Sequence, residues 1–88
     1  MNKMDTNKSI KQEYIDLTKK YFDNFIDTKE YSNSCFELEK RLLRLKDYDL
    51  DLLGVMFLSD SLMVYKSLDE IAPQNHLKAI RQYLQENK

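Results

Sequence analysis

Apolar side chains recur at three- and four-residue steps between Ile10 and Ile26, with polar residues between them. This spacing places the apolar side chains on one face of a helix. Ser9, followed three residues later by Gln12, has the pattern of a capping box, in which two side chains bond free backbone N–H groups at a helix start. We therefore expect a first helix from Ser9 to about Ile26, with Phe25 on its apolar face.

A second helix is predicted directly after the first, because Asp27 and Glu30 repeat the cap pattern. Its apolar residues alternate steps of four and three, which is typical of a helix packed nearly antiparallel on a neighbour. They are Tyr31, Cys35, Leu38, Leu42 and Leu45. On the solvent side we expect an i,i+4 ion pair between Glu37 and Arg41.

Apolar residues almost encircle a third predicted helix, from about Leu50 to Lys66, with Asp49 or Asp51 as its N-cap. On a helical wheel they form three sides: Leu50, Leu53, Phe57, Val64 and Leu68; Val55, Leu58, Leu62 and Tyr65; and Leu52, Met56 and Met63. Such a helix is either central in a bundle or partly covered by a partner.

A fourth helix is predicted from Pro73 or Asn75 to Gln85, after a break near Ala72, because proline disfavours a helical residue before it. The chain holds one glycine and one proline in 88 residues, so turns are few. The fold class is therefore all-α, a small antiparallel four-helix bundle. We expect one domain over residues 1–88, with 1–8 a flexible N-terminus.

Charge and cysteine content narrow the function classes. The net charge is −1, but residues 45–75 hold two basic and six acidic groups. A net basic surface for nucleic acid is therefore not expected, nor is binding to an anionic membrane. One cysteine, a polar start without a secretory pattern, and the absence of a long apolar run together favour the cytoplasm.

Catalytic chemistry has few candidates in this chain. Cys35 lies on the buried stripe of the second helix, and His76 is expected at the surface or at a helix cap. Two Cys and His residues cannot build a structural zinc site, and the aspartates at 47, 49 and 51 lack the glycine and glutamate of a calcium loop. We expect no enzymatic activity, no metal and no cofactor.

Asp60 is the residue that a simple bundle does not explain. On the wheel it lies between Leu53 and the methionine side, where a buried carboxylate without a partner would be costly. We therefore expect Asp60 to point outward and the Leu52, Met56 and Met63 side to be partly exposed as a binding patch with an acidic rim. The alternative is that the fourth helix or the N-terminal segment covers that side.

The predicted partner-binding residues combine this patch with acidic groups and an aromatic anchor near it. They are Asp47, Tyr48, Asp49, Asp51, Leu52, Met56, Asp60, Met63, Asp69 and Glu70.

The run from Tyr14 to Leu43 (YIDLTKKYFDNFIDTKEYSNSCFELEKRLL) has an aromatic-rich first helix, a minimal capped link and a second helix that opens with Tyr31. It resembles the first two helices of small immunity proteins that protect bacteria from tRNA-cleaving toxins of the colicin D and contact-dependent growth inhibition types. The run from Leu52 to Tyr65, with Asp69, Pro73 and Leu77, resembles their later helices.

This resemblance implies a four-helix fold, no enzymatic activity and a tight one-to-one complex in which acidic groups fill a nuclease's basic cleft. The near-neutral net charge departs from the strongly acidic members of the family, so a mixed apolar and acidic contact is expected. We expect an antitoxin, monomeric when free, that blocks a cognate nuclease. The alternatives are a homodimeric helical interaction module and a phage-type inhibitor of a host protein.

Overall fold

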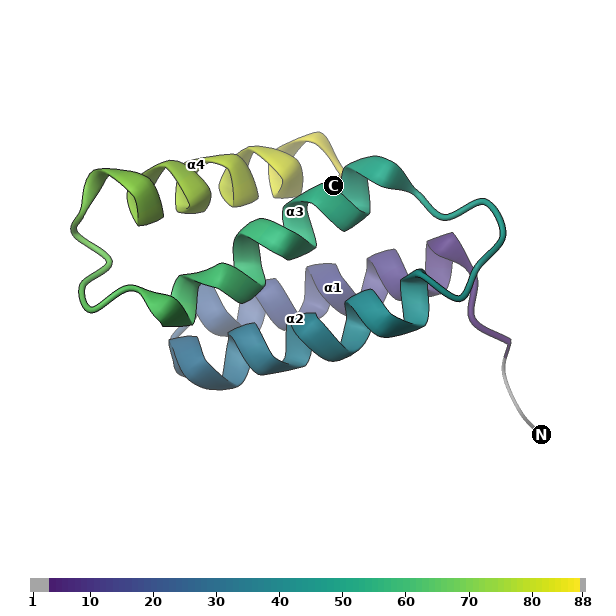
Figure 1. Ribbon diagram of the computed structural model, residues 1–88, viewed down its shortest axis with the longest axis horizontal. Helices are drawn as coiled ribbons and strands as arrows, with labels where there is room; N and C mark the ends of the chain where they lie inside the picture. Colours follow the sequence, from purple (N-terminus) through teal and green to yellow (C-terminus); the bar gives the residue numbers. More distant parts are fainter. Residues whose placement is uncertain (1–3, 88) are drawn as a thin grey trace.

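Four α-helices follow one another along the chain in the computed structural model, which describes residues 4–87 (Figure 1). They are α1 (Asn7–Phe22), α2 (Thr28–Leu42), α3 (Leu50–Asp60) and α4 (Ile71–Glu86), and a 3-10 turn, η1 (Ser61–Val64), extends α3. Consecutive helices run in opposite directions, and the described part of the chain contains no strand. The predicted all-α four-helix bundle is confirmed.

The first helix begins and ends earlier than its apolar pattern predicts. Thr6 is the N-cap and forms a capping box with Ser9, so Ser9 lies inside the first turn and does not pair with Gln12. The helix ends at Phe22, and Asn24 takes a left-handed backbone conformation with φ of 65°. That turn leaves Phe25 78% exposed, so its predicted place on the apolar face is wrong.

The caps of α2 and α3 are the predicted ones. An Asp27 carboxylate oxygen accepts the Glu30 N–H at 2.8 Å, and the Asp49 carboxylate accepts the N–H groups of Asp51 and Leu52. Carboxylates at these positions satisfy free N–H groups and lie at the positive end of the helix dipole. The predicted extent of α3 is wrong at its end, because the α-helix stops at Asp60 and its last turn is 3-10.

The fourth helix begins at Ile71, before the break that was predicted near Ala72. Pro73 fits into the first turn because the N–H groups there have no partner inside the helix. Buried Pro73, Leu77 and Ile80 then face the core. At its far end the ring of Tyr83 meets that of Tyr14 edge-on at 5.9 Å.

The N-terminal residues that the structure describes are attached to the bundle. Asn7 donates to the Asp47 carbonyl at 2.7 Å and accepts the Asp49 N–H at 2.9 Å. Asp5 and Glu13 both bind Arg41, so the predicted pair of Glu37 with Arg41 does not form. Asp5 and Asn7, which lie in the segment that was predicted to be flexible, therefore contact the bundle. Residues 1–3 of that segment lie outside the described residues.

Buried hydroxyls form a closed cluster where α1, α2 and α3 meet. The Ser59 hydroxyl lies 2.7 Å from the Tyr14 hydroxyl and 3.0 Å from that of Tyr31, which is 2.8 Å from Thr18 Oγ1. The Thr18 and Ser59 hydroxyls donate to backbone carbonyls of α1 and α3, respectively. Burial raises the pKa of Tyr14 to about 12 and that of Tyr31 higher still, so both rings stay neutral and act as hydrogen-bond hubs.

Candidate partner-binding surface

Besides Met63, five large apolar side chains of α2 and its C-cap, α3 and η1 remain exposed after the bundle has formed. Phe57 keeps 49% of its surface exposed and Leu50 keeps 71%. The set falls at seven-residue intervals along the chain: Phe36, Leu43, Leu50, Phe57 and Val64. We call these five residues the α2–α3 face.

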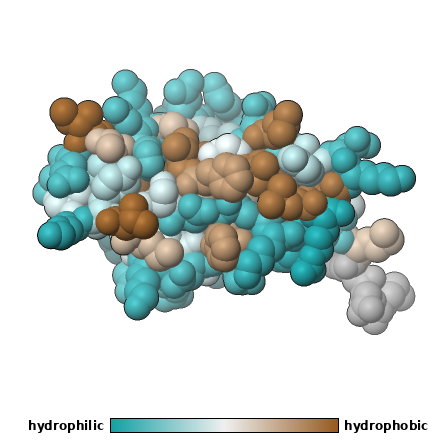
Figure 2. All heavy atoms as spheres, in the orientation of Figure 1, coloured by the Kyte–Doolittle hydropathy of each residue, from teal (hydrophilic) through white to brown (hydrophobic). Residues whose placement is uncertain are grey.

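The register of α2 on α3 brings the two rows of this face together. Seven residues make nearly two helical turns, so residues at that interval share one side of a helix. The Ser32 hydroxyl donates to the Ser59 carbonyl at 2.9 Å, and because the helices are antiparallel the turn of Phe36 then lies near the turn of Phe57. Figure 2 shows brown apolar atoms across this side of the molecule, with teal polar atoms beside them.

Two carboxyl groups, Glu39 of α2 and Asp60 of α3, meet between these rows. Phe36 of α2 lies three residues before Glu39, and Leu43, the C-cap of α2, lies four after it. Phe57 lies three residues before Asp60. Residues at those offsets are neighbours on a helix surface, so exposed apolar groups border the pair on both helices. Glu39 is only 3% exposed, and Asp60 is half-buried.

The proton balance of this pair is unusual. Burial and the hydrogen-bonding Asp60 carboxyl raise the pKa of Glu39 to about 8. Two ionised carboxylates cannot hydrogen-bond to each other, so the proton on Glu39 is what links them. Even so, the buried oxygen Oε2 of Glu39 has no hydrogen-bond partner among the described residues. Oε2 of Glu39 is therefore a buried acceptor to which no donor of the described residues is bonded.

Lys40 and Arg41, the cations of α2 nearest to Glu39 in sequence, form ion pairs with other carboxylates. Lys40 binds Glu37 at 3.0 Å and lies over the Phe36 ring at 4.7 Å. Arg41 donates hydrogen bonds to the carboxylates of Glu13 on α1 and of Asp5 just before α1, and these bonds raise its pKa further. Within residues 4–87 the ion pairs involve neither Glu39 nor Asp60.

The predicted exposed side of α3 is wrong by about a quarter turn. Leu52 and Met56 are fully buried, because α1 and α2 cover the side of α3 that carries Ser59. Only Met63 of that predicted patch is exposed, at 45%. Asp60 was expected to point outward, yet it is half-buried and faces Glu39.

The other predicted partner-binding residues lie at the two ends of α3. Asp47, Tyr48, Asp49 and Asp51 are at its start, where Tyr48 packs against the core and the Asp49 carboxylate serves as the cap. Asp69 and Glu70 are exposed beyond its far end, and Glu70 precedes α4 as its N-cap residue. The structure therefore does not bring the predicted set into one patch.

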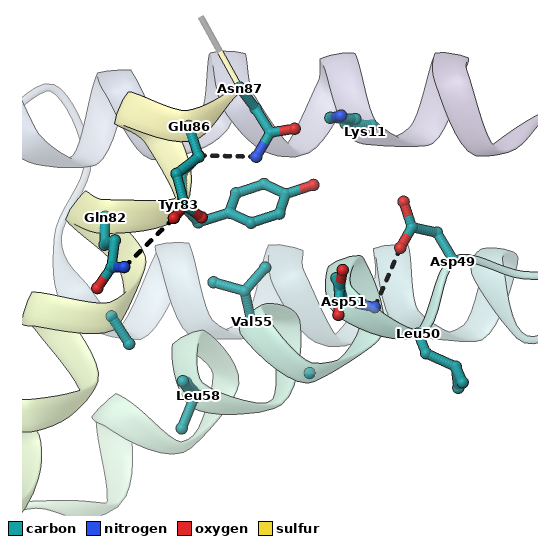
Figure 3. Close-up of a pocket in the computed structure, with 12 residues that line it drawn as sticks. Lys11, Asp49, Leu50, Asp51, Val55, Leu58, Gln82, Tyr83, Glu86 and Asn87 are labelled. Carbon is teal, nitrogen blue, oxygen red and sulfur yellow. Dashed lines mark hydrogen bonds between the residues drawn. The ribbon is translucent and has the colours of Figure 1, made fainter.

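A groove of about 600 Å³ lies between α3 and α4. Two of those aspartates, Asp49 and Asp51, lie at this groove (Figure 3). Asp49, Asp51 and Glu86 line it, and Lys11 of α1 lies at its edge. The Tyr83 hydroxyl is buried there and has no hydrogen-bond partner within residues 4–87, and burial raises its pKa to about 12. A methyl group added at Gly54, on the groove wall, would meet nothing within 4 Å. This groove is a second, more polar candidate.

Sequence reasoning missed Glu39, Phe36 and Leu43. The signal was present, because Phe36 and Leu43 are apolar residues off the buried stripe of an amphipathic helix. Glu39 reads as an ordinary solvent-facing glutamate until the position of α3 is known. Its burial depends on a neighbouring helix and not on the period of its own.

The candidates for chemistry remain apart from one another. Cys35 is fully buried, as predicted, and burial raises the pKa of its thiol to about 12. His76 is half-buried beside the Ser61 hydroxyl at 3.1 Å. Among residues 4–87 no three His, Cys, Asp or Glu side chains are placed to hold a metal ion, and no helix is long and apolar enough to cross a bilayer.

No family model, curated protein or solved structure gives a significant match to this chain.

Proposed function

We propose that this chain is an immunity protein that binds a cognate nuclease toxin through the α2–α3 face and blocks its active site. The observation that carries the proposal is the exposed apolar face around an unsatisfied carboxyl pair. Clustered apolar groups on a small protein mark interaction surfaces, and aromatic residues supply much of the binding energy at interface centres. Phe36 and Phe57 fit that role because both are half-exposed on one side of the molecule.

The charge of α3 and its two ends favours a basic partner. The stretch 45–75 holds six acidic groups against two basic ones, and it includes α3 and both of its ends. A nuclease that holds RNA must present Lys and Arg in its cleft, so acidic groups near an apolar contact supply complementarity. This supports the nuclease-toxin class over a partner with an acidic surface.

Growth protection tests the proposal. A tRNA-cleaving toxin domain of the colicin D or contact-dependent growth inhibition type is expressed in cells with and without the chain, and the chain is expected to restore growth in the presence of its cognate toxin. Phe57→Asp places a charge at the centre of the face and is expected to weaken binding by about 100-fold or more, as for a hot-spot residue. Phe25→Asp is the matched control, since Phe25 is exposed outside the face. Equal protection by both variants contradicts the proposed interface.

The homodimeric alternative uses the same face and predicts a different mass. Light scattering is expected to give a monomer for the free chain and a one-to-one mass for the complex. A free dimer that Phe57→Asp converts to monomer would instead assign the face to a second copy of the chain.

A further inference from the structure

The Glu39 and Asp60 carboxyls form an acidic pair whose hydrogen bonding is not completed by the described part of the fold. Glu39 is 3% exposed, and its Oε2 has no hydrogen-bond partner in the part of the chain that the structure describes. Asp60 keeps partial access to solvent. Buried acidic groups in a fold are normally matched by a cation or by donors, because an uncompensated buried carboxylate is costly. Here the exposed apolar groups Phe36, Leu43 and Phe57 border the pair instead.

We propose that this pair receives one arginine side chain of the partner protein, and that its arrival releases to solvent the proton that the two carboxyls hold. This proposal rests on the proposed function and names the contact at the centre of its interface. A guanidinium group has donors in a planar fork that can serve two carboxylates at once, and its faces stack on aromatic rings such as Phe36 and Phe57.

Charge and protons are conserved in this binding step. Before binding, the pair carries one proton and one negative charge. After binding, both carboxyls are ionised, the guanidinium supplies one positive charge, and the buffer takes the proton. The net charge of the site therefore stays at −1.

The surroundings of Glu39 support this proton release. The titratable groups that interact with it are Asp60 on α3 and the Cys35 thiol on α2. Since burial and Asp60 raise the pKa of Glu39 to about 8, the proton is held at neutral pH. The site is therefore mostly protonated at pH 7, and binding there is expected to release most of one proton.

Calorimetry of the complex with the nuclease domain measures this release. Titrations at pH 7 in buffers of different ionisation enthalpy are expected to show the release of most of one proton for the wild-type chain and of none from this site for Glu39→Gln. The wild-type affinity is expected to rise about ninefold from pH 6 to pH 7 and to level off above pH 8, because only the deprotonated pair binds. Glu37→Gln, at an exposed acid of the same helix, serves as control.

The outcomes separate the two proposals. Binding without proton release and without pH dependence overturns the arginine site and leaves the immunity function standing. No binding of the nuclease domain overturns the immunity function.

A partner-free experiment keeps the arginine site testable in that case. Leu43→Arg places a guanidinium four residues after Glu39 in the free chain, where it can reach the pair. Carbon NMR of the Glu39 carboxyl is expected to show its titration midpoint falling below about 6, whereas Leu43→Gln leaves it near 8. A midpoint unchanged by Leu43→Arg shows that the pair does not accept a cation and overturns the inference.

Discussion

Ser59 and Asp60 are consecutive residues of α3, yet they belong to polar clusters of opposite character. Ser59 joins the hydroxyls of Tyr14, Tyr31 and Thr18, in which short hydrogen bonds link every member. Asp60 joins Glu39, whose Oε2 has no partner among the described residues. The first cluster is completed by the fold and stabilises it. The second is left incomplete beside exposed apolar groups, which is where a partner can complete it.

The largest effect on stability is expected at the completed cluster. Tyr31→Phe removes the hydroxyl that lies within bonding distance of Thr18, Ser59 and Tyr14, and leaves polar groups buried. We expect the free energy of unfolding to fall by about 1–3 kcal/mol, measured by urea denaturation. Tyr48→Phe is the control, because that half-buried ring makes no hydrogen bond among residues 4–87. A loss as small as the control's would show that the hydroxyl cluster contributes little.

At the pair of Glu39 and Asp60, by contrast, removal of the ionisable group is expected to raise the free energy of unfolding. The pKa of Glu39 is about 8 in the folded chain and about 4.5 when unfolded, so the folded state holds a proton that the unfolded state releases. Stability from this site is thus present at low pH and is lost as pH rises from about 4.5 to 8. Glu39→Gln, which resembles the protonated form, should raise the free energy of unfolding by about 1 kcal/mol at pH 8.5.

At pH 5 the same substitution is expected to have little effect, and Glu37→Gln should show no such pH dependence. Denaturation of both variants at the two pH values makes the comparison. A Glu39→Gln variant that is destabilised at pH 8.5 would mean that the ionised glutamate has an internal partner.

Gly54→Ala gives a smaller change that is independent of pH. Glycine inside an exposed helix is less favourable than alanine, and the added methyl group meets no atom within 4 Å. We expect a gain of about 0.5–1 kcal/mol at both pH 5 and pH 8.5, measured by thermal denaturation. This variant therefore shows what a general gain in helix stability looks like beside the pH-dependent gain of Glu39→Gln. A loss of stability would show that the groove wall at Gly54 is crowded.

The sequence predicted the helices well because their signals are local. Asp27 and Asp49 cap their helices through side chains two to three residues from their targets, and the buried stripe of α2 follows from spacing alone. The start of α1 was misplaced because Thr6 and Ser9 compete as caps, and the structure uses both in one box.

The candidate site was harder to predict because α3 is apolar on several sides. Its period shows that Met56 and Phe57 lie on different sides, but only the positions of α1, α2 and α4 decide which side is covered. Met56 is buried and Phe57 is half-exposed as a result. Asp60 was correctly singled out as unusual, whereas its partner Glu39 could be found only from the packing of α2 on α3.

The most direct test of the contrast between the two clusters is the titration of Glu39 in the free wild-type chain, followed by carbon NMR of its side-chain carboxyl. A midpoint near pH 8 is expected, because the carboxyl is buried beside Asp60 without an internal cation. A midpoint near 4.5, the ordinary value for a glutamate, would contradict the account, since it would mean that solvent or an internal cation already satisfies the pair.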